Sequence, residues 1–248
     1  MRILLISLLA LAAIAPASAA DLKLLTAGAF KSVALELVPE FEKKTGHKVA
    51  IENDTAGGLA RRIAGGEYFD VVVLTPAALA PLLGSKVVES SVKPLARVGI
   101  GLAIKQGAPP PDISTVDAFK QTLLAARAIA YTDPASGGTT GIYLAKLIEK
   151  MGIAEQLKPK TVLVKGGLAA EKIVNGEADI AMQPASELLA VPGAMLVGPI
   201  PLEVQSYTIY AGAVSAGARD QSAADALLAA LHGPDKAALL KKKGMELP

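Results

Sequence analysis

Residues 131–141, with the sequence YTDPASGGTTG, combine glycines and hydroxyl side chains at a junction between a strand-like run and a helical run. Residues 128–130 are apolar, and residues 142–148 repeat their apolar positions at helical spacing. Glycines at such a junction let backbone N–H groups point outward, beside the unpaired N–H groups of the helix. The segment therefore predicts an anion site, although the hydroxyl groups alternatively only cap the helix. The predicted ligand-binding residues here are Ser136, Gly137, Gly138, Thr139 and Thr140.

Two further polar side chains stand beside apolar, strand-like runs. Arg97 directly precedes the apolar run 98–104, and a guanidinium group binds a carboxylate in bidentate fashion. Arg97 is therefore a predicted ligand-binding residue, with an interlobe salt bridge or an exposed side chain as the alternatives. Gln183 ends an apolar run before Pro184 and is predicted as a neutral donor to the ligand. Its alternative role is that of a capping or surface amide.

The residue types that usually carry catalysis are sparse in this chain. His47 lies in a polar turn and His232 near a helix end, so neither indicates a base or a metal site. The sequence contains no cysteine, no HExxH motif and no GxSxG motif. These features favour a binding protein, with no predicted catalytic residue, metal or cofactor.

The first residues of the chain resemble an export signal. Arg2 precedes an apolar run over residues 3–15, and Ala17-Ser18-Ala19 forms an A-x-A cleavage site. We expect residues 1–20 to be a cleaved signal peptide, since the apolar run is short for the alternative, a membrane anchor. Without cysteine there is neither a lipid attachment site nor a disulfide, which favours a periplasmic location. A net charge of +2 gives no electrostatic footprint for nucleic acid.

Strand-like and helix-like segments alternate along the rest of the chain, which predicts an α/β fold with a mainly parallel sheet. Two segments, 95–101 and 197–205, are typical of crossings between lobes. We therefore expect one lobe from residues 21–96 and 197–248, a second from residues 97–196, and a ligand cleft between them where strand ends meet. The predicted strands include 22–26, 48–53, 70–74, 161–164, 180–183 and 206–214; the predicted helices include 33–44, 59–65, 115–126, 169–175 and 223–232.

Several short motifs, taken in order, resemble one protein family. They are TAGAF at 26–30, FEKKTG at 41–46, GGLARRI at 57–63, DVVVL at 70–74 and NGEADIA at 175–181, followed by Lys243-Gly244. The chain is thereby similar to type II periplasmic solute-binding proteins, in the branch of the molybdate-binding proteins of ABC importers. The resemblance implies a two-lobe fold, a monomer, a small anionic ligand and a membrane permease as partner. It also implies that ligand-binding residues lie in the first two loops: Ala29, Phe30, Thr55, Ala56 and Gly57.

The sequence departs from this family where molybdate binders carry serines. Ala29 and Ala56 lack the hydroxyl groups, and each lost hydrogen bond to a charged ligand costs about 1.5–3 kcal/mol. Backbone amides remain, with Thr55 and Ser32 nearby as substitutes. We therefore expect a small organic carboxylate in preference to molybdate. The expected function is capture of this anion for an ABC importer.

Two other functions are compatible with the same sequence. Relatives of this fold resemble aconitate isomerase, so the alternative is a periplasmic isomerase of an unsaturated polycarboxylate. Such an enzyme needs a general base, for which Lys31, Tyr207 and Glu203 are candidates. A sensor subunit that docks on a receptor is a third possibility.

Overall fold

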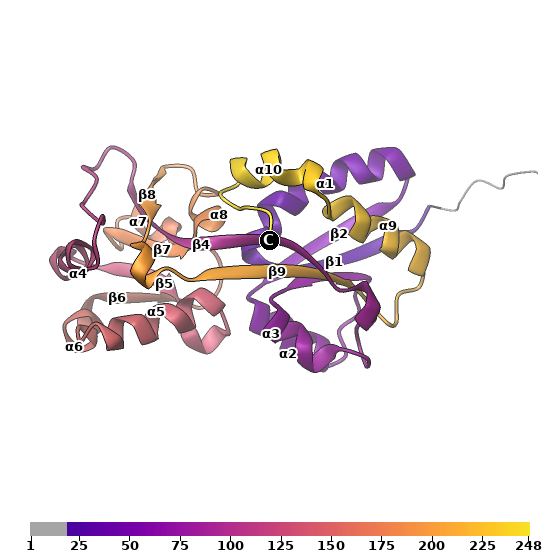
Figure 1. Ribbon diagram of the computed structural model, residues 1–248, viewed down its shortest axis with the longest axis horizontal. Helices are drawn as coiled ribbons and strands as arrows, with labels where there is room; N and C mark the ends of the chain where they lie inside the picture. The colour runs from indigo at the N-terminus through magenta and orange to yellow at the C-terminus, as the bar shows by residue number, and fades with distance from the viewer. Residues whose placement is uncertain (1–18) are drawn as a thin grey trace, which may run out of the picture.

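A computed structural model describes residues 19–248, which form two α/β lobes joined by two long strands (Figure 1). The predicted signal peptide therefore lies almost wholly outside the described residues. Within these residues, no helix is both long enough and apolar enough to cross a membrane.

The strands follow the order β2-β1-β3-β9-β4-β7-β5-β6, and β8 also pairs with β4. At one end β1 runs parallel to β2 and β3, and at the other β5 runs parallel to β6 and β7. Among the strands that the structure describes, each pairing that involves β4 or β9 is antiparallel. The strands are β1 (Asp21–Ala27), β2 (Lys48–Asp54), β3 (Val71–Leu74), β4 (Lys93–Lys105), β5 (Ile129–Thr132), β6 (Thr161–Val164), β7 (Ile180–Pro184), β8 (Ala194–Pro199) and β9 (Tyr207–Val214).

Helices cover both faces of the strands in each lobe (Figure 1). α1, α9 and α10 lie on one side of the first lobe, while α2 and α3 lie on the other. The α-helices are α1 (Gly28–Thr45), α2 (Ala56–Ala64), α3 (Pro76–Leu79), α4 (Val116–Ala125), α5 (Thr139–Lys150), α6 (Ala154–Leu157), α7 (Ala170–Val174), α8 (Ala185–Leu188), α9 (Gln221–Leu231) and α10 (Ala237–Lys242).

Strand β4 passes from one lobe to the other. Its first part pairs with β9 as far as Gly99, and from Ile100 onward it pairs with β7. The buried side chains divide at the same place, because Val98 belongs to the core of the first lobe and Ile100 to a core of the second. The chain returns between Ile200, in the second lobe, and Tyr210, in the first. Strand β4 and the segment between Ile200 and Tyr210 thus connect the two sets of hydrophobic cores.

The predicted α/β class with mainly parallel strands is confirmed, but two local predictions were incomplete. Helix α1 begins at Gly28, well before the predicted residue 33. Ala29 and Phe30 are buried in its first turn and continue the helical spacing of Val33, Ala34 and Leu37, which the prediction did not extend this far. Strand β8 was not predicted at all, since its half-buried side chains and its Gly198-Pro199 ending resemble a loop.

Candidate functional site

A cavity of about 490 Å³ lies between the lobes, at the carboxyl ends of strands from both. Segments that follow β1, β2, β5 and β7 contribute to its wall, as the open-sheet rule predicts. The residues that line it are Ala27, Gly28, Ala29, Lys31, Ser32, Leu35, Asn53, Asp54, Thr55, Ala56, Thr132, Gly138, Thr139, Thr140, Gly166, Gly167, Leu168, Glu171, Gln183, Pro184, Ser186, Glu187, Ala190 and Tyr210.

Three helices, α1, α2 and α5, begin at this cavity. No side chain caps the N-terminus of α1 or of α5, so their first N–H groups have no side-chain acceptor. In α2 the side chain of Thr55 accepts a hydrogen bond from the N–H group of Gly58. Unpaired N–H groups and the positive ends of helix dipoles favour a negatively charged ligand.

Two hydroxyl groups in the cavity wall are buried and unpaired. Oγ of Ser32, on α1, and Oγ of Ser186, on α8, have no hydrogen-bond partner among the described residues. Ser186 is 2% exposed, so the unmade hydrogen bond costs about 1–3 kcal/mol. A ligand that accepts from these hydroxyl groups recovers that free energy. They are therefore a second indication, independent of the helix ends, that the cavity binds an acceptor-rich molecule.

Glu187, on α8, presents a carboxyl group to the same cavity. Burial raises the pKa of Glu187 to about 8, so the neutral acid predominates at pH 7. Burial and the neighbouring Glu187 also raise the pKa of the Tyr210 phenol, on β9. The remaining ionisable groups of the wall are Lys31 on α1, Asp54 at the end of β2 and Glu171 on α7. Among the described residues, Lys31 is the one cationic side chain that lines the cavity.

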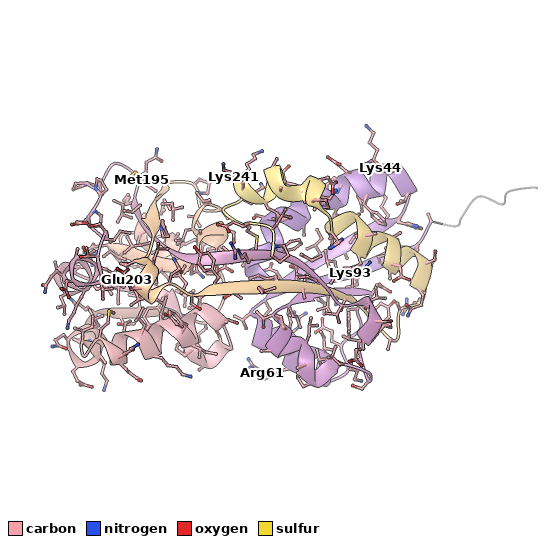
Figure 2. The ribbon with its side chains drawn as sticks, viewed as in Figure 1. Lys44, Arg61, Lys93, Met195, Glu203 and Lys241 are labelled. Carbon is pink, nitrogen blue, oxygen red and sulfur yellow. The ribbon has the colours of Figure 1, made fainter. Side chains whose placement is uncertain are left out.

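The two lobes touch at one edge of the cavity. Oγ1 of Thr55 donates to the carbonyl oxygen of Ser136 at 2.6 Å, and the N–H group of Gly57 donates to that of Gly137 at 3.1 Å. Arg61 Nη2 also donates to the carbonyl oxygen of Ser136, at 3.0 Å. Figure 2 shows Arg61 extending from the lower edge of the first lobe toward the second. These contacts hold the lobes together beside the cavity.

The structure brings many of the predicted ligand-binding residues to the cavity. The predicted residues that line it are Ala29, Thr55, Ala56, Gly138, Thr139, Thr140 and Gln183. Others lie outside its wall: Phe30 is buried in the core of the first lobe, and Gly57, Ser136 and Gly137 form the interlobe contact. Oγ of Ser136 donates to the carbonyl oxygen of Asp133, as in the capping alternative.

Arg97 is not part of the cavity wall, contrary to the expectation from sequence. Its Nη2 and Nε atoms lie 2.8 and 3.1 Å from Oε2 of Glu246, and its guanidinium group lies over the ring of Tyr207. Because Glu246 pairs with this exposed edge of β4, the guanidinium group is drawn away from the cleft. The structure therefore supports a salt bridge rather than a ligand contact.

Gln183 lines the cavity, but its amide is occupied. Nε2 donates to Oγ1 of Thr132 and to the carbonyl oxygen of Gly167, and Oε1 accepts from the N–H group of Ala169. Gln183 thus holds the loop after β6 against β5. This arrangement fits the capping alternative better than a donor to the ligand.

The sequence analysis did not select Glu187, Ser186 or Tyr210 as ligand-binding residues, although Ser186 lies in a strand end that was expected at the cleft. No motif distinguishes these residues, although Ser186 and Glu187 directly follow a predicted strand, where cleft residues were expected. Of the earlier candidates for a base, Lys31 lines the cavity, whereas Tyr207 and Glu203 do not. Glu203 lies in the second lobe, well to the side of the lobe junction (Figure 2).

Two α/β lobes around a cavity at their strand ends give the chain the fold of the type II solute-binding proteins. The chain belongs to the family described as bacterial extracellular solute-binding protein, which it matches over residues 22–246.

Known proteins resemble the chain at two levels of similarity. It is 36% identical over 232 residues to a protein named aconitate isomerase from a Pseudomonas species, covering 91% of this chain and 87% of that protein. The periplasmic molybdate-binding protein of Azotobacter vinelandii is 19% identical with a TM-score of 0.75, covering 92% of this chain and 99% of that one. The sulfate-binding protein SubI of Mycobacterium tuberculosis is 16% identical with a TM-score of 0.74, covering 92% and 87%. These two structures establish the fold.

Proposed function

We propose that the protein binds an unsaturated polycarboxylate in the interlobe cavity and isomerises it, as in the interconversion of trans- and cis-aconitate. The observation that carries this proposal is the 36% identity to an aconitate isomerase across nearly the whole described chain. The structures of anion-binding proteins match at much lower identity, and they support the fold without identifying the ligand.

The cavity fits an organic acid better than a tetrahedral oxyanion. Its volume of about 490 Å³ lies within the range of about 300–1,000 Å³ that is usual for small organic ligands. Ala29 and Ala56 line it without hydroxyl groups, whereas the unpaired hydroxyl groups come from Ser32 and Ser186. Lys31 and the first turns of α1 and α5 supply positive potential from both lobes. Such dispersed donors suit several carboxylates on one carbon chain.

A second candidate function is capture of an organic carboxylate for an ABC importer, without chemistry. The family match favours it, since the family is described as solute-binding protein and not as an enzyme. In either function we expect the protein to work in the periplasm.

One experiment separates the two functions. Purified protein without its first 20 residues is incubated with trans-aconitate, and the cis isomer is followed by proton NMR. We expect the cis isomer to accumulate to equilibrium at a rate proportional to protein concentration. Binding of trans-aconitate by calorimetry without conversion would favour the importer function. A thermal-shift screen over molybdate, sulfate and di- and tricarboxylates tests the ligand class, because a ligand of the native state raises Tm.

A further inference from the structure

Glu187 occupies an unusual position in the cavity. It lies on α8, a short helix directly after β7, where Ala185 packs against the core of the first lobe and Leu188 belongs to a core of the second. Its side chain points at the first turn of α1, since a methyl group on Gly28 would overlap Oε1 of Glu187. The carboxyl group therefore lies at the junction of the lobes, beside a helix N-terminus that favours anions.

Among the described residues, no hydrogen bond or ion pair involves the Glu187 carboxyl group, and burial is the one cause of its raised pKa. The other carboxyl groups of the wall differ from it. Oδ1 of Asp54 accepts from the N–H group of Thr55, and Oδ2 lies 3.8 Å from Arg62. Glu171 is exposed at the rim. Glu187 is thus the carboxyl group of this cavity that is both unpaired and half-buried.

An unpaired carboxyl group is unfavourable in a site that only binds anions. When ionised it repels a bound carboxylate, and when neutral it contributes at most one donor. The same group is useful where a proton has to leave carbon and return to it. A raised pKa makes its conjugate base stronger at near-neutral pH.

We propose that Glu187 is the base that moves the proton in the isomerisation, an inference that rests on the proposed function. The carboxylate of Glu187 takes a proton from the methylene carbon of the substrate, and the C–H electron pair becomes a new carbon–carbon double bond. The electron pair of the original double bond then takes the proton back from Glu187 at the former vinylic carbon, at the other end of the three-carbon allylic unit. The double bond has moved by one position, its new geometry is cis or trans, and no oxidant or further reactant is needed.

The ionisable groups that face Glu187 come from several elements. They are Lys31 from α1, Asp54 from β2, Glu171 from α7 and Tyr210 from β9. Burial, rather than any of these charges, is the cause that raises the pKa of Glu187. Tyr210 stays neutral over the working range, because burial and Glu187 raise its pKa. We therefore expect the rise of kcat/KM with pH to follow the ionisation of Glu187.

The test compares Glu187→Gln with the wild-type protein in conversion of trans-aconitate. We expect kcat to fall by about 10²–10⁴-fold, the usual contribution of a general base. Calorimetry should show trans-aconitate binding that is unchanged or tighter, because a like charge is removed. In D₂O the wild-type protein should place deuterium on the methylene and vinylic carbons of the substrate, because the proton held by Glu187 exchanges with solvent before it returns. Glu187→Gln should not do so. Wild-type kcat/KM should rise with pH toward the pKa of about 8.

Two further variants complete the test. Glu203→Gln makes the same chemical change outside the cavity and should retain wild-type kcat. Glu187→Asp keeps a carboxyl group and should retain the rising pH profile at reduced kcat, so it tests the role even if Glu187→Gln folds poorly. A Glu187→Gln variant with more than a tenth of wild-type kcat overturns the assignment of Glu187 while the isomerase function stands. A wild-type protein that does not convert trans-aconitate overturns both.

Discussion

The contact between the lobes at Gly57 and Gly137 can be disturbed by a single methyl group. In Gly57→Ala the new Cβ would lie 2.9 Å from the carbonyl oxygen of Gly137 and 3.0 Å from its Cα. Both are backbone atoms, so no side chain can rotate to make room. Helix α2 itself is not weakened, because alanine is a better helix former than glycine by about 0.8–1.0 kcal/mol. The lobes therefore have to separate at this edge.

The size of the effect follows from the hydrogen bonds that cross the edge. The N–H group of Gly57, Oγ1 of Thr55 and Nη2 of Arg61 all donate to carbonyl oxygens of the other lobe. Each such bond contributes about 0.5–1.5 kcal/mol. Loss of the Gly57 bond and weakening of the other two therefore destabilise the closed arrangement, in which the lobes touch at this edge, by about 1–3 kcal/mol. Because both lobes line the cavity, the ligand binds the closed arrangement best. We expect Kd for trans-aconitate to rise by about 5–150-fold.

Calorimetry measures this change in affinity, and small-angle scattering measures the separation of the lobes in the free protein. Gly65→Ala is the matched control, since it makes the same substitution at the far end of α2, where an added Cβ meets only carbonyl oxygens of Arg61 and Arg62. We expect Gly65→Ala to keep the wild-type Kd and scattering curve. If Gly57→Ala keeps both as well, the interlobe contact does not control binding and our reasoning is refuted.

Three further predictions concern single side chains. Arg97→Ala should leave the Kd for trans-aconitate unchanged. It should lower the free energy of unfolding by at most about 1 kcal/mol, because the ion pair with Glu246 is exposed. Weaker binding of trans-aconitate by calorimetry would contradict the placement of Arg97 outside the cavity. Ser186→Ala should leave the free energy of unfolding in urea unchanged or raise it by about 1 kcal/mol, since it removes an unpaired buried hydroxyl group. It should nevertheless weaken binding of trans-aconitate. A loss of stability with unchanged affinity would show that Oγ of Ser186 has a partner within the protein. Glu187 has a higher pKa in the folded than in the unfolded protein, so the folded state binds more protons and the free energy of unfolding should fall as pH rises from about 4.5 to about 8. Urea unfolding of Glu187→Gln should lack this part of the decline. Identical pH dependence of stability in both proteins would exclude a raised pKa of Glu187.

The sequence by itself predicted the alternation of strands and helices, the mainly parallel sheet and the family. It also predicted that strand ends would form the ligand cleft, and residues after β1, β2, β5 and β7 do line the cavity. These features are local or follow from general rules of topology, since apolar periodicity and glycine-rich junctions are properties of neighbouring residues. For that reason Ala29, Ala56 and residues 138–140 could be found without coordinates.

Tertiary structure decided which side chains face the ligand. Arg97 is paired with Glu246, which lies 149 residues further along the chain, and no pattern near either residue indicates that partner. Glu187 lies in a stretch of sequence with no distinguishing motif. It becomes a half-buried, unpaired acid only because α8 packs between the lobes against Gly28. Burial and charge pairing depend on contacts between segments distant in sequence, so the chemistry of this cavity is fixed by packing rather than by any motif.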